Sequence, residues 1–261
     1  MSRGSWTSDL IDLLLPTGCV VCRDWIPGRN ADRIVCTSCV MRLKTPPWPR
    51  CPRCHAPSGT GRAEAPDCLE CREWPAELEF ARYAYRLEGA AADLVHALKY
   101  EGWCEAAPFM SRAMASEFRV TALDDSCRAQ RRTIVVPVPT SPRRERERGY
   151  NQAGLLAEGV SHALGLPLYS VLVRTRSDGS QTSLSPEERR ENVRGAFALS
   201  AKARAVLTGA QVVLVDDVLT TGATAAEAAR VLMAAGGSAV TLLAFARALP
   251  GTQTGASERA A

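Results

Sequence analysis

A chain of 261 residues in which 46% are hydrophobic and 23% are charged has the composition of a globular protein with a sizeable core, which excludes an intrinsically disordered chain. No apolar run reaches the roughly 18 residues that a membrane-spanning helix requires, and the net charge of +4 is too small to demand nucleic acid as the partner. We therefore expect a cytoplasmic protein without a membrane span that accepts an anionic ligand.

The chain starts with a short apolar stretch from Leu10 to Leu15, interrupted by Asp12. This stretch lacks the cleavage site of a signal peptide and leads directly into a cysteine-rich region. We interpret it as a short amphipathic helix.

The next segment contains eight of the ten cysteines, arranged as four C-x-x-C pairs. The pairs are Cys19/Cys22, Cys36/Cys39, Cys51/Cys54 and Cys68/Cys71. A shift of 32 residues maps the first two pairs onto the last two, so the region is an internal repeat. Each C-x-x-C turn points two thiolates at one cation, and two such turns complete the tetrahedral shell of a structural zinc ion. We therefore predict two structural zinc sites, which stabilise a segment too small to fold on its own core.

Three points about the cysteines stay open. The pairs combine either sequentially, which we favour, or crosswise, because the spacing does not decide between the two. The same pattern would be a disulfide framework in a secreted protein, although no export signal is visible. His55 directly follows Cys54, where such a turn usually has glycine. We interpret it as a bystander, and the alternative is that it replaces a cysteine ligand.

Beyond a proline-rich boundary near residue 75, the pattern changes to alternating strands and helices. Strands are predicted at Phe80–Tyr85, Ile134–Val138, Leu168–Val173, Val212–Val215 and Val240–Phe245, and helices at Ala90–Tyr100, Asn151–Leu164 and Gly222–Ala235. This alternation indicates an α/β fold with a mainly parallel sheet, whose ligand site lies beyond the carboxyl ends of the strands. We expect an N-terminal helix with the zinc sites over residues 1–76, the α/β domain over 77–248 and a disordered tail over 249–261.

The most informative segment runs from Val212 to Thr224, with the sequence VVLVDDVLTTGAT. A buried strand ends in Asp216 and Asp217 and then enters a small, hydroxyl-rich turn with Gly222 that opens a helix. N–H groups at a helix start bind phosphate, and glycine lets the backbone approach an anion closely. Two carboxylates beside a phosphate site suit a ligand that also carries hydroxyls or a divalent cation. A ribose 5-phosphate meets both conditions.

This segment resembles the signature of type I phosphoribosyltransferases, in which four hydrophobic and two acidic residues precede a small Thr/Gly loop. The resemblance implies that the chain binds 5-phosphoribosyl-1-pyrophosphate (PRPP) through Asp216, Asp217, Val218, Leu219, Thr220, Thr221, Gly222, Ala223 and Thr224. It further implies that the loop holds the 5-phosphate. Asp216 and Asp217 would be the catalytic pair at the ribose 2′- and 3′-hydroxyls, with Mg²⁺ bridging ribose and pyrophosphate.

Further segments narrow the family. They are Leu98-Lys99-Tyr100-Glu101-Gly102, Val136-Pro137-Val138-Pro139, Arg143 to Gln152, Gln181 to Leu184 and Arg189 to Phe197. Together with the cysteine repeat and the signature, they look like the ComF family of competence-associated proteins over roughly residues 8 to 247. This resemblance implies a type I phosphoribosyltransferase-like parallel sheet joined to an N-terminal double zinc ribbon. It also implies a role in natural transformation, the uptake of DNA.

Basic residues near these motifs are candidates for holding pyrophosphate, namely Lys99, Arg143 and Arg148. The two arginines belong to a segment with four Arg and two Glu, which equally suits ion pairs on a solvated helix. The polar stretch from Arg174 to Pro186 predicts a mobile flap over the ligand.

Three functions fit these residues. The first is a Mg²⁺-dependent transferase that cleaves PRPP, in nucleotide-related metabolism or in DNA uptake. The second is a non-catalytic PRPP sensor or a protein that grips single-stranded DNA, with Trp25, Trp48 and Trp74 as candidate contacts. The third is a component of DNA import that docks onto a helicase or channel through its zinc ribbons.

Overall fold

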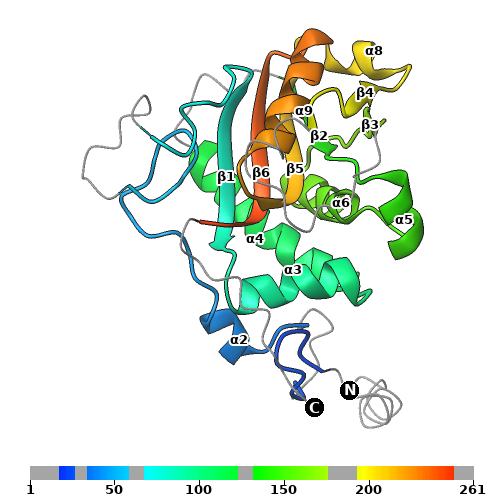
Figure 1. Ribbon diagram of the computed structural model, residues 1–261. Helices are drawn as coiled ribbons and strands as arrows, with labels where there is room; N and C mark the ends of the chain where they lie inside the picture. The colour runs from blue at the N-terminus through cyan, green and yellow to red at the C-terminus, as the bar shows by residue number, and fades with distance from the viewer. Residues whose placement is uncertain (1–17, 27–33, 59–67, 123–131, 176–192, 250–261) are drawn as a thin grey trace, which may run out of the picture.

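The computed structural model describes residues 18–26, 34–58, 68–122, 132–175 and 193–249 (Figure 1). The expected helix near Leu10, most of the expected flap after Arg174 and the tail from Pro250 lie outside these residues. Within the described ranges, no helix is long and apolar enough to cross a bilayer.

Four parallel strands form the main sheet in the order β1-β6-β5-β2. Their bounds are β1 Leu78–Arg86, β2 Thr133–Pro137, β5 Gln211–Leu219 and β6 Ala239–Arg247. β6 is buried along its whole length, as expected for a central strand that is covered on both faces. The parallel α/β sheet that the sequence predicts is confirmed.

Helices cover both faces of this sheet (Figure 1). The main ones are α3 Ala90–Tyr100, α4 Ala106–Ala122, α6 Gln152–Leu164 and α9 Ala223–Ala234. Buried side chains of α3, α4 and α6 form one hydrophobic cluster with Val213 and Val215 of β5. Alanines of α9 form a second cluster with Val212 and Leu214. Because successive strand residues point to opposite faces, β5 contributes alternately to the two cores.

The stretch from Leu168 to Val173, which the sequence predicts as one strand, is divided in the structure. Leu168 makes a single parallel bridge to Val135 of β2, and the chain then turns away through two exposed residues. It continues as β3 (Leu172–Arg174), which pairs antiparallel with β4 (Phe197–Leu199) in a separate small sheet. The sequence reasoning missed β4 because a strand of three residues is too short to show an alternating pattern.

Other short elements complete the described fold. They are α2 Thr37–Met41, α5 Pro142–Arg148 and α8 Ala203–Leu207. α5 begins with Ser141 as its N-cap, whose hydroxyl accepts a hydrogen bond from the Arg144 N–H, and it ends at Gly149 in a left-handed conformation. The arginine-rich segment is therefore a capped helix.

The cysteine repeat is also a structural repeat of two ribbons, with residues 18–43 in the first and 50–75 in the second. An antiparallel bridge joins Gly18 to Trp25, and the positions 32 residues later form the same bridge. The residue after the second cysteine of each ribbon is left-handed, with φ of 66° at Arg23 and 58° at His55. The tight turn that usually takes glycine is thus made by other residues in both ribbons.

The two ribbons pack on opposite faces of the sheet. Cys19 and Cys39 of the first ribbon belong to the hydrophobic cluster that contains α3, α4 and α6. Cys51, Cys54 and Cys71 of the second ribbon belong to the cluster that contains α9. Each ribbon therefore extends a different core.

Candidate functional site

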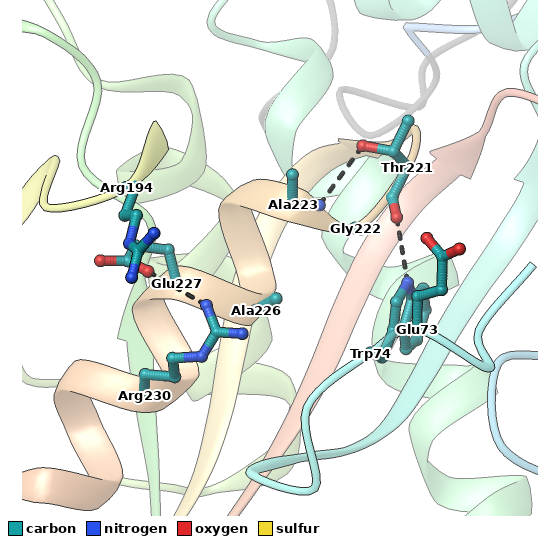
Figure 2. A pocket seen from close by; sticks show the side chains of 9 residues that line it. All are labelled: Glu73, Trp74, Arg194, Thr221, Gly222, Ala223, Ala226, Glu227 and Arg230. Atoms are coloured by element: carbon teal, nitrogen blue, oxygen red, sulfur yellow. Dashed lines mark hydrogen bonds and ion pairs between the residues drawn. The ribbon is translucent and has the colours of Figure 1, made fainter. Parts of the chain in front are cut away.

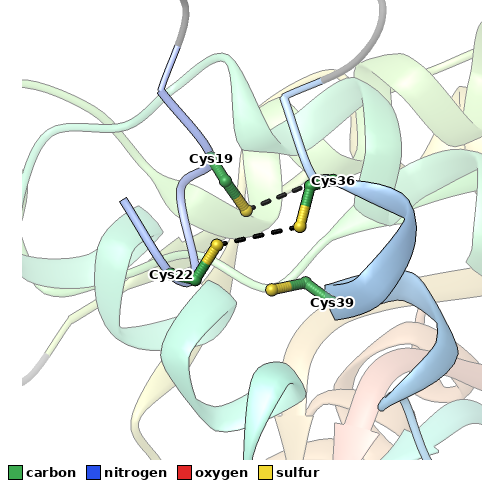
Figure 3. A group of neighbouring side chains, drawn as sticks. All are labelled: Cys19, Cys22, Cys36 and Cys39. Carbon is green, nitrogen blue, oxygen red and sulfur yellow. Dashed lines mark hydrogen bonds between the residues drawn. The ribbon is translucent and has the colours of Figure 1, made fainter. Parts of the chain in front are cut away.

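The cysteines gather into two compact clusters, and Figure 3 shows the first of them. The sulfur atoms within each cluster lie within 4.8 Å of one another, in the groups Cys19/Cys22/Cys36/Cys39 and Cys51/Cys54/Cys68/Cys71. The separations are 3.7 Å for Cys22–Cys36, 3.8 Å for Cys51–Cys71 and 3.7 Å for Cys54–Cys68. A tetrahedral zinc ion with Zn–S distances of about 2.3 Å places its sulfurs about 3.8 Å apart. Each cluster is therefore consistent with one zinc ion.

The sequential grouping of the cysteines is the one that the structure contains. Sulfur separations of 3.7–3.8 Å are far longer than the roughly 2.05 Å of a disulfide, so the clusters are not disulfide pairs. His55 is directed elsewhere, because its Nδ1 lies 3.1 Å from Oε1 of Glu117 on α4. Burial lowers the pKa of His55. It lies outside both cysteine clusters.

A second group of polar residues lies at the carboxyl edge of the main sheet. The ladder between β2 and β5 ends at Pro137 and Val215, whereas β6 accompanies β5 as far as Leu219. Asp216 and Asp217 therefore belong to β5 itself, just beyond the point where β2 leaves it. Ligand sites of parallel sheets form where neighbouring strands diverge in this way.

Asp217 forms an ion pair with Lys99, which the last turn of α3 carries to the sheet edge. The Lys99 Nζ lies 2.9 Å from the Asp217 Oδ1, and the two side chains are 23% and 11% exposed. Burial alone would lower the pKa of Lys99, but the charges of Asp217 and Asp216 outweigh it and the pKa is raised. Lys99 is thus a fixed positive charge beside the acidic pair.

Asp216 has a different environment from its neighbour. Its carboxyl group accepts a hydrogen bond of 2.9 Å from the backbone N–H of Asp217. Burial raises the pKa of Asp216 to about 7 and the charge of Asp217 adds to this effect, while Lys99 and Arg174 oppose it. Near neutral pH this carboxyl group is therefore able to donate or to accept a hydrogen bond.

The signature loop, residues Thr220–Thr224, connects β5 to α9. Gly222 is the N-cap of α9 and has a left-handed φ of 81°. The Thr221 Oγ1 accepts a 3.4 Å hydrogen bond from the Ala223 N–H. The first N–H groups of a helix have no carbonyl partner within it and lie at the positive end of its dipole. The loop therefore has the donors that a phosphate needs.

The two arginines that the sequence assigns to pyrophosphate lie on α5. Arg143 is exposed, and its Nε lies 2.7 Å from Oε1 of Glu147. Arg148 stacks 5.0 Å from the ring of Tyr100, the residue after Lys99. The structure thus brings Lys99 to the acidic pair and Arg148 to the end of the same helix, whereas Arg143 is engaged on the surface of α5.

Sequence reasoning did not connect Trp74 with this site. Its indole N–H donates a 3.0 Å hydrogen bond to the Thr221 carbonyl, so the second ribbon contacts the signature loop (Figure 2). With 8% exposure, Trp74 is a packed residue and not an open platform for bases. Arg174 was predicted only as the start of the flap, and the effect of its charge on Asp216 was not anticipated. Neither relation has a local signal, because each joins segments that are distant in sequence.

A cavity of about 640 Å³ lies beside the loop, between the second ribbon and α9 (Figure 2). Its lining is Glu73, Trp74, Arg194, Thr221, Gly222, Ala223, Ala226, Glu227 and Arg230. The two acidic and two basic side chains balance in charge. Glu227 accepts a 2.7 Å hydrogen bond from the Gly195 N–H and lies 3.4 Å from Arg230.

Comparison with known families matches two parts of the chain. A double zinc ribbon domain matches residues 10–73, and a phosphoribosyl transferase domain matches residues 151–253. The DNA utilization protein YhgH of Escherichia coli K12 is 32% identical over 243 residues, which cover 91% of this chain and 100% of the relative.

Two competence proteins are also similar to this chain. Competence protein F of Haemophilus influenzae is 28% identical over 88% of this chain and 96% of its own length. Competence protein ComFC of Bacillus subtilis is 28% identical over 80% and 81%. A solved structure of the allosteric regulatory enzyme of purine biosynthesis covers 53% of this chain and 25% of its own at 22% identity, with a TM-score of 0.31, too low to bear on the fold.

Proposed function

Because the chain belongs to the ComF/YhgH family, in which a double zinc ribbon is joined to a phosphoribosyltransferase domain, we propose that it binds PRPP or a related phosphoribosyl ligand in the course of DNA uptake or utilisation. The observation that carries this proposal is the junction of β5 with α9. It combines a mostly buried acidic pair and a helix start with a left-handed glycine in one continuous segment, and α3 adds a lysine that is ion-paired to Asp217.

Each part of the junction has a role in this proposal. The signature loop holds the 5-phosphate through N–H groups and threonine hydroxyls. Asp216 and Asp217 orient the ribose through its 2′- and 3′-hydroxyls. Lys99 faces the pyrophosphate from its ion pair with Asp217, and Arg148 adds positive charge from α5. If the glycosidic bond breaks, the same residues orient the sugar and balance the charge that pyrophosphate carries away.

The donor set also fits Mg²⁺, which prefers carboxylate and phosphate oxygens. Asp216 and Asp217 supply such oxygens, and the ligand would supply the others. When bound, Mg²⁺ would neutralise part of the pyrophosphate charge.

A second function, binding of single-stranded DNA, has support from exposed tryptophans in the ribbon region. Trp25 and Trp48 of the ribbon region are 62% and 76% exposed, and the Arg50 guanidinium stacks 4.7 Å from the Trp48 ring. Exposed aromatic rings beside arginine are the usual contacts of single-stranded nucleic acid. Given the names of the relatives, we propose these exposed tryptophans as the contacts where DNA would bind.

The decisive experiment is calorimetry with PRPP and Mg²⁺, combined with an assay for pyrophosphate release. We expect saturable binding that weakens about tenfold or more in Asp216→Asn, Asp217→Asn and Lys99→Met, as for the loss of a hydrogen bond to a charged group. Glu158→Gln and Lys202→Met, which change exposed side chains on α6 and beside α8, are the matched controls. Release of pyrophosphate identifies an enzyme, and binding without release identifies a sensor.

Two results would count against the proposal. One is the absence of any PRPP binding by zinc-loaded protein. The other is equal binding by the aspartate variants and by the controls. Salt-dependent retention of single-stranded DNA that is lost in Trp25→Ala/Trp48→Ala, without PRPP binding, would leave the second function alone.

A further inference from the structure

Trp74 contacts the signature loop at two successive residues. Its Nε1–H donates to the Thr221 carbonyl at 3.0 Å, and a Cβ placed on Gly222 would lie 2.7 Å from three atoms of the indole (Figure 2). Gly222 is the residue that needs a left-handed φ of 81°. The indole therefore borders the loop at the turn from which the N–H groups of α9 start.

The zinc ribbon by itself does not require tryptophan at this position. The counterpart of Trp74, 32 residues earlier, is Arg42, and both donate a backbone hydrogen bond to the carbonyl of the last cysteine in their ribbon. Arg42 is exposed, and its guanidinium lies 2.8 Å from the Cys39 sulfur. Trp74 is buried against the loop instead. The two repeats therefore differ at the position where the second one reaches the site.

Two arginines tie Trp74 to the cysteine cluster. Arg53 donates hydrogen bonds to the carbonyls of Cys71 and Trp74, at 3.0 and 3.3 Å. Arg247, fully buried at the end of β6, donates to the Cys54 carbonyl at 2.7 Å and lies 6.0 Å from the Trp74 ring. Movement of the cluster backbone would therefore move Trp74.

We infer that Trp74 is a positioning residue for the signature loop and that, through it, metal occupancy of the second cysteine cluster sets the affinity of the loop for a phosphate group. This inference rests on the phosphate-binding role proposed for the loop. With the cluster closed around a metal ion, the indole fixes the Thr221 carbonyl and leaves the N–H groups of the following turn aligned. Without the metal, the segment after Cys68 loses its anchor and the loop relaxes.

The test removes the donor and keeps an aromatic ring. In Trp74→Phe, we expect ribose 5-phosphate to bind about threefold to tenfold more weakly, the effect of losing one hydrogen bond. Zinc content should stay unchanged, and amide hydrogen exchange at residues 220–224 should become faster. Tyr169→Phe, which removes the hydroxyl group of an exposed aromatic ring outside the proposed sites, is the control. Unchanged affinity together with unchanged exchange in Trp74→Phe overturns the inference.

Amide exchange requires no ligand, so it separates this inference from the proposed function. If the unmodified protein binds neither PRPP nor ribose 5-phosphate, the proposed function fails. Faster loop exchange in Trp74→Phe would then still show the positioning contact.

The role of the metal is tested by substituting one equivalent cysteine in each of the two clusters. Cys36 and Cys68 occupy equivalent places in the two clusters and are both partly buried. We expect Cys68→Ser to accelerate exchange at residues 220–224 and to weaken ribose 5-phosphate binding, whereas Cys36→Ser leaves both as in the unmodified protein. Equal effects of the two substitutions on the loop, or no effect of Cys68→Ser, would rule out metal control through Trp74.

Discussion

The largely buried site at the edge of the sheet contains two acidic side chains and one basic side chain, those of Asp216, Asp217 and Lys99. If all three were charged, the site would carry a net negative charge, which disfavours an anionic phosphoribosyl ligand. The pKa of about 7 for Asp216 reduces this conflict, because part of the population is protonated near neutral pH. The neighbouring Asp217 remains paired with Lys99 and keeps an acceptor for a hydroxyl group. Asp216 is therefore the residue of the pair whose protonation state changes near neutral pH.

The raised pKa of Asp216 predicts that the free energy of unfolding depends on pH. The pKa of Asp216 rises from 3.8 in the unfolded chain to about 7 on folding, so the folded state binds a proton that the unfolded state has lost. The contribution is fully present below about pH 4 and is lost as the pH rises through about 7. In urea unfolding, the stability of the protein relative to Asp216→Asn should fall as the pH rises from about 5.5 to about 8. A stability difference that does not vary with pH in this range would contradict the prediction.

At the scale of elements, the strand-to-helix junction depends on a residue that fits two constraints. Gly222 must adopt a left-handed backbone to turn β5 into α9, and it must leave room for the indole of Trp74. Each constraint favours glycine, so any other residue here is expected to cost stability on both counts. The signature motif thus serves the fold of the junction as well as the proposed phosphate contact.

Gly209 offers a matched comparison for the two constraints. It also has a left-handed φ, 70°, but no atom lies within 4 Å of a Cβ placed there. We expect Gly209→Ala to cost about 1–2 kcal/mol, the penalty of the left-handed conformation alone. Gly222→Ala should cost about 1–3 kcal/mol more because of the clash with Trp74. Chemical denaturation measures both, and equal costs would show that the indole readily moves aside.

At the scale of the whole molecule, one sheet separates two hydrophobic clusters, and each of them takes in one cysteine cluster. The ribbons are therefore extensions of the α/β core and not independent appendages. Arg247 strengthens this union, since its buried guanidinium joins the end of β6 to the Cys54 carbonyl and to Glu70. Metal binding and folding of the α/β domain are expected to be linked.

Elemental analysis should accordingly find about two zinc ions per chain, one for each tetrahedral cluster. Removal of the metal by a strong chelator should lower the midpoint of thermal unfolding for the whole protein, because the cysteines that pack in both cores lose the ion that holds them together. Calorimetric scans before and after chelation measure this effect. A content of one zinc ion or none would refute the assignment of the clusters.

The sequence alone predicted the features that depend on neighbouring residues. The cysteine spacing indicated two metal clusters, and the alternation of apolar segments indicated a parallel sheet. The helix Ala90–Tyr100 was predicted with its observed bounds, while the nearby α4 was missed. Val212–Thr224 was recognised because a strand, an acidic pair and a helix start follow one another without interruption.

Only the tertiary structure decided the contacts between distant segments. It settled that the cysteine pairs combine sequentially, that Lys99 meets Asp217, and that Leu168–Val173 leaves the main sheet. It also brought Trp74 to Thr221 across 147 residues of sequence. Local patterns fix which chemical groups a segment carries and how its backbone turns, because those depend on propensity and periodicity. Which segments meet depends on how two cores close around one sheet, and that is a property of the whole packed chain.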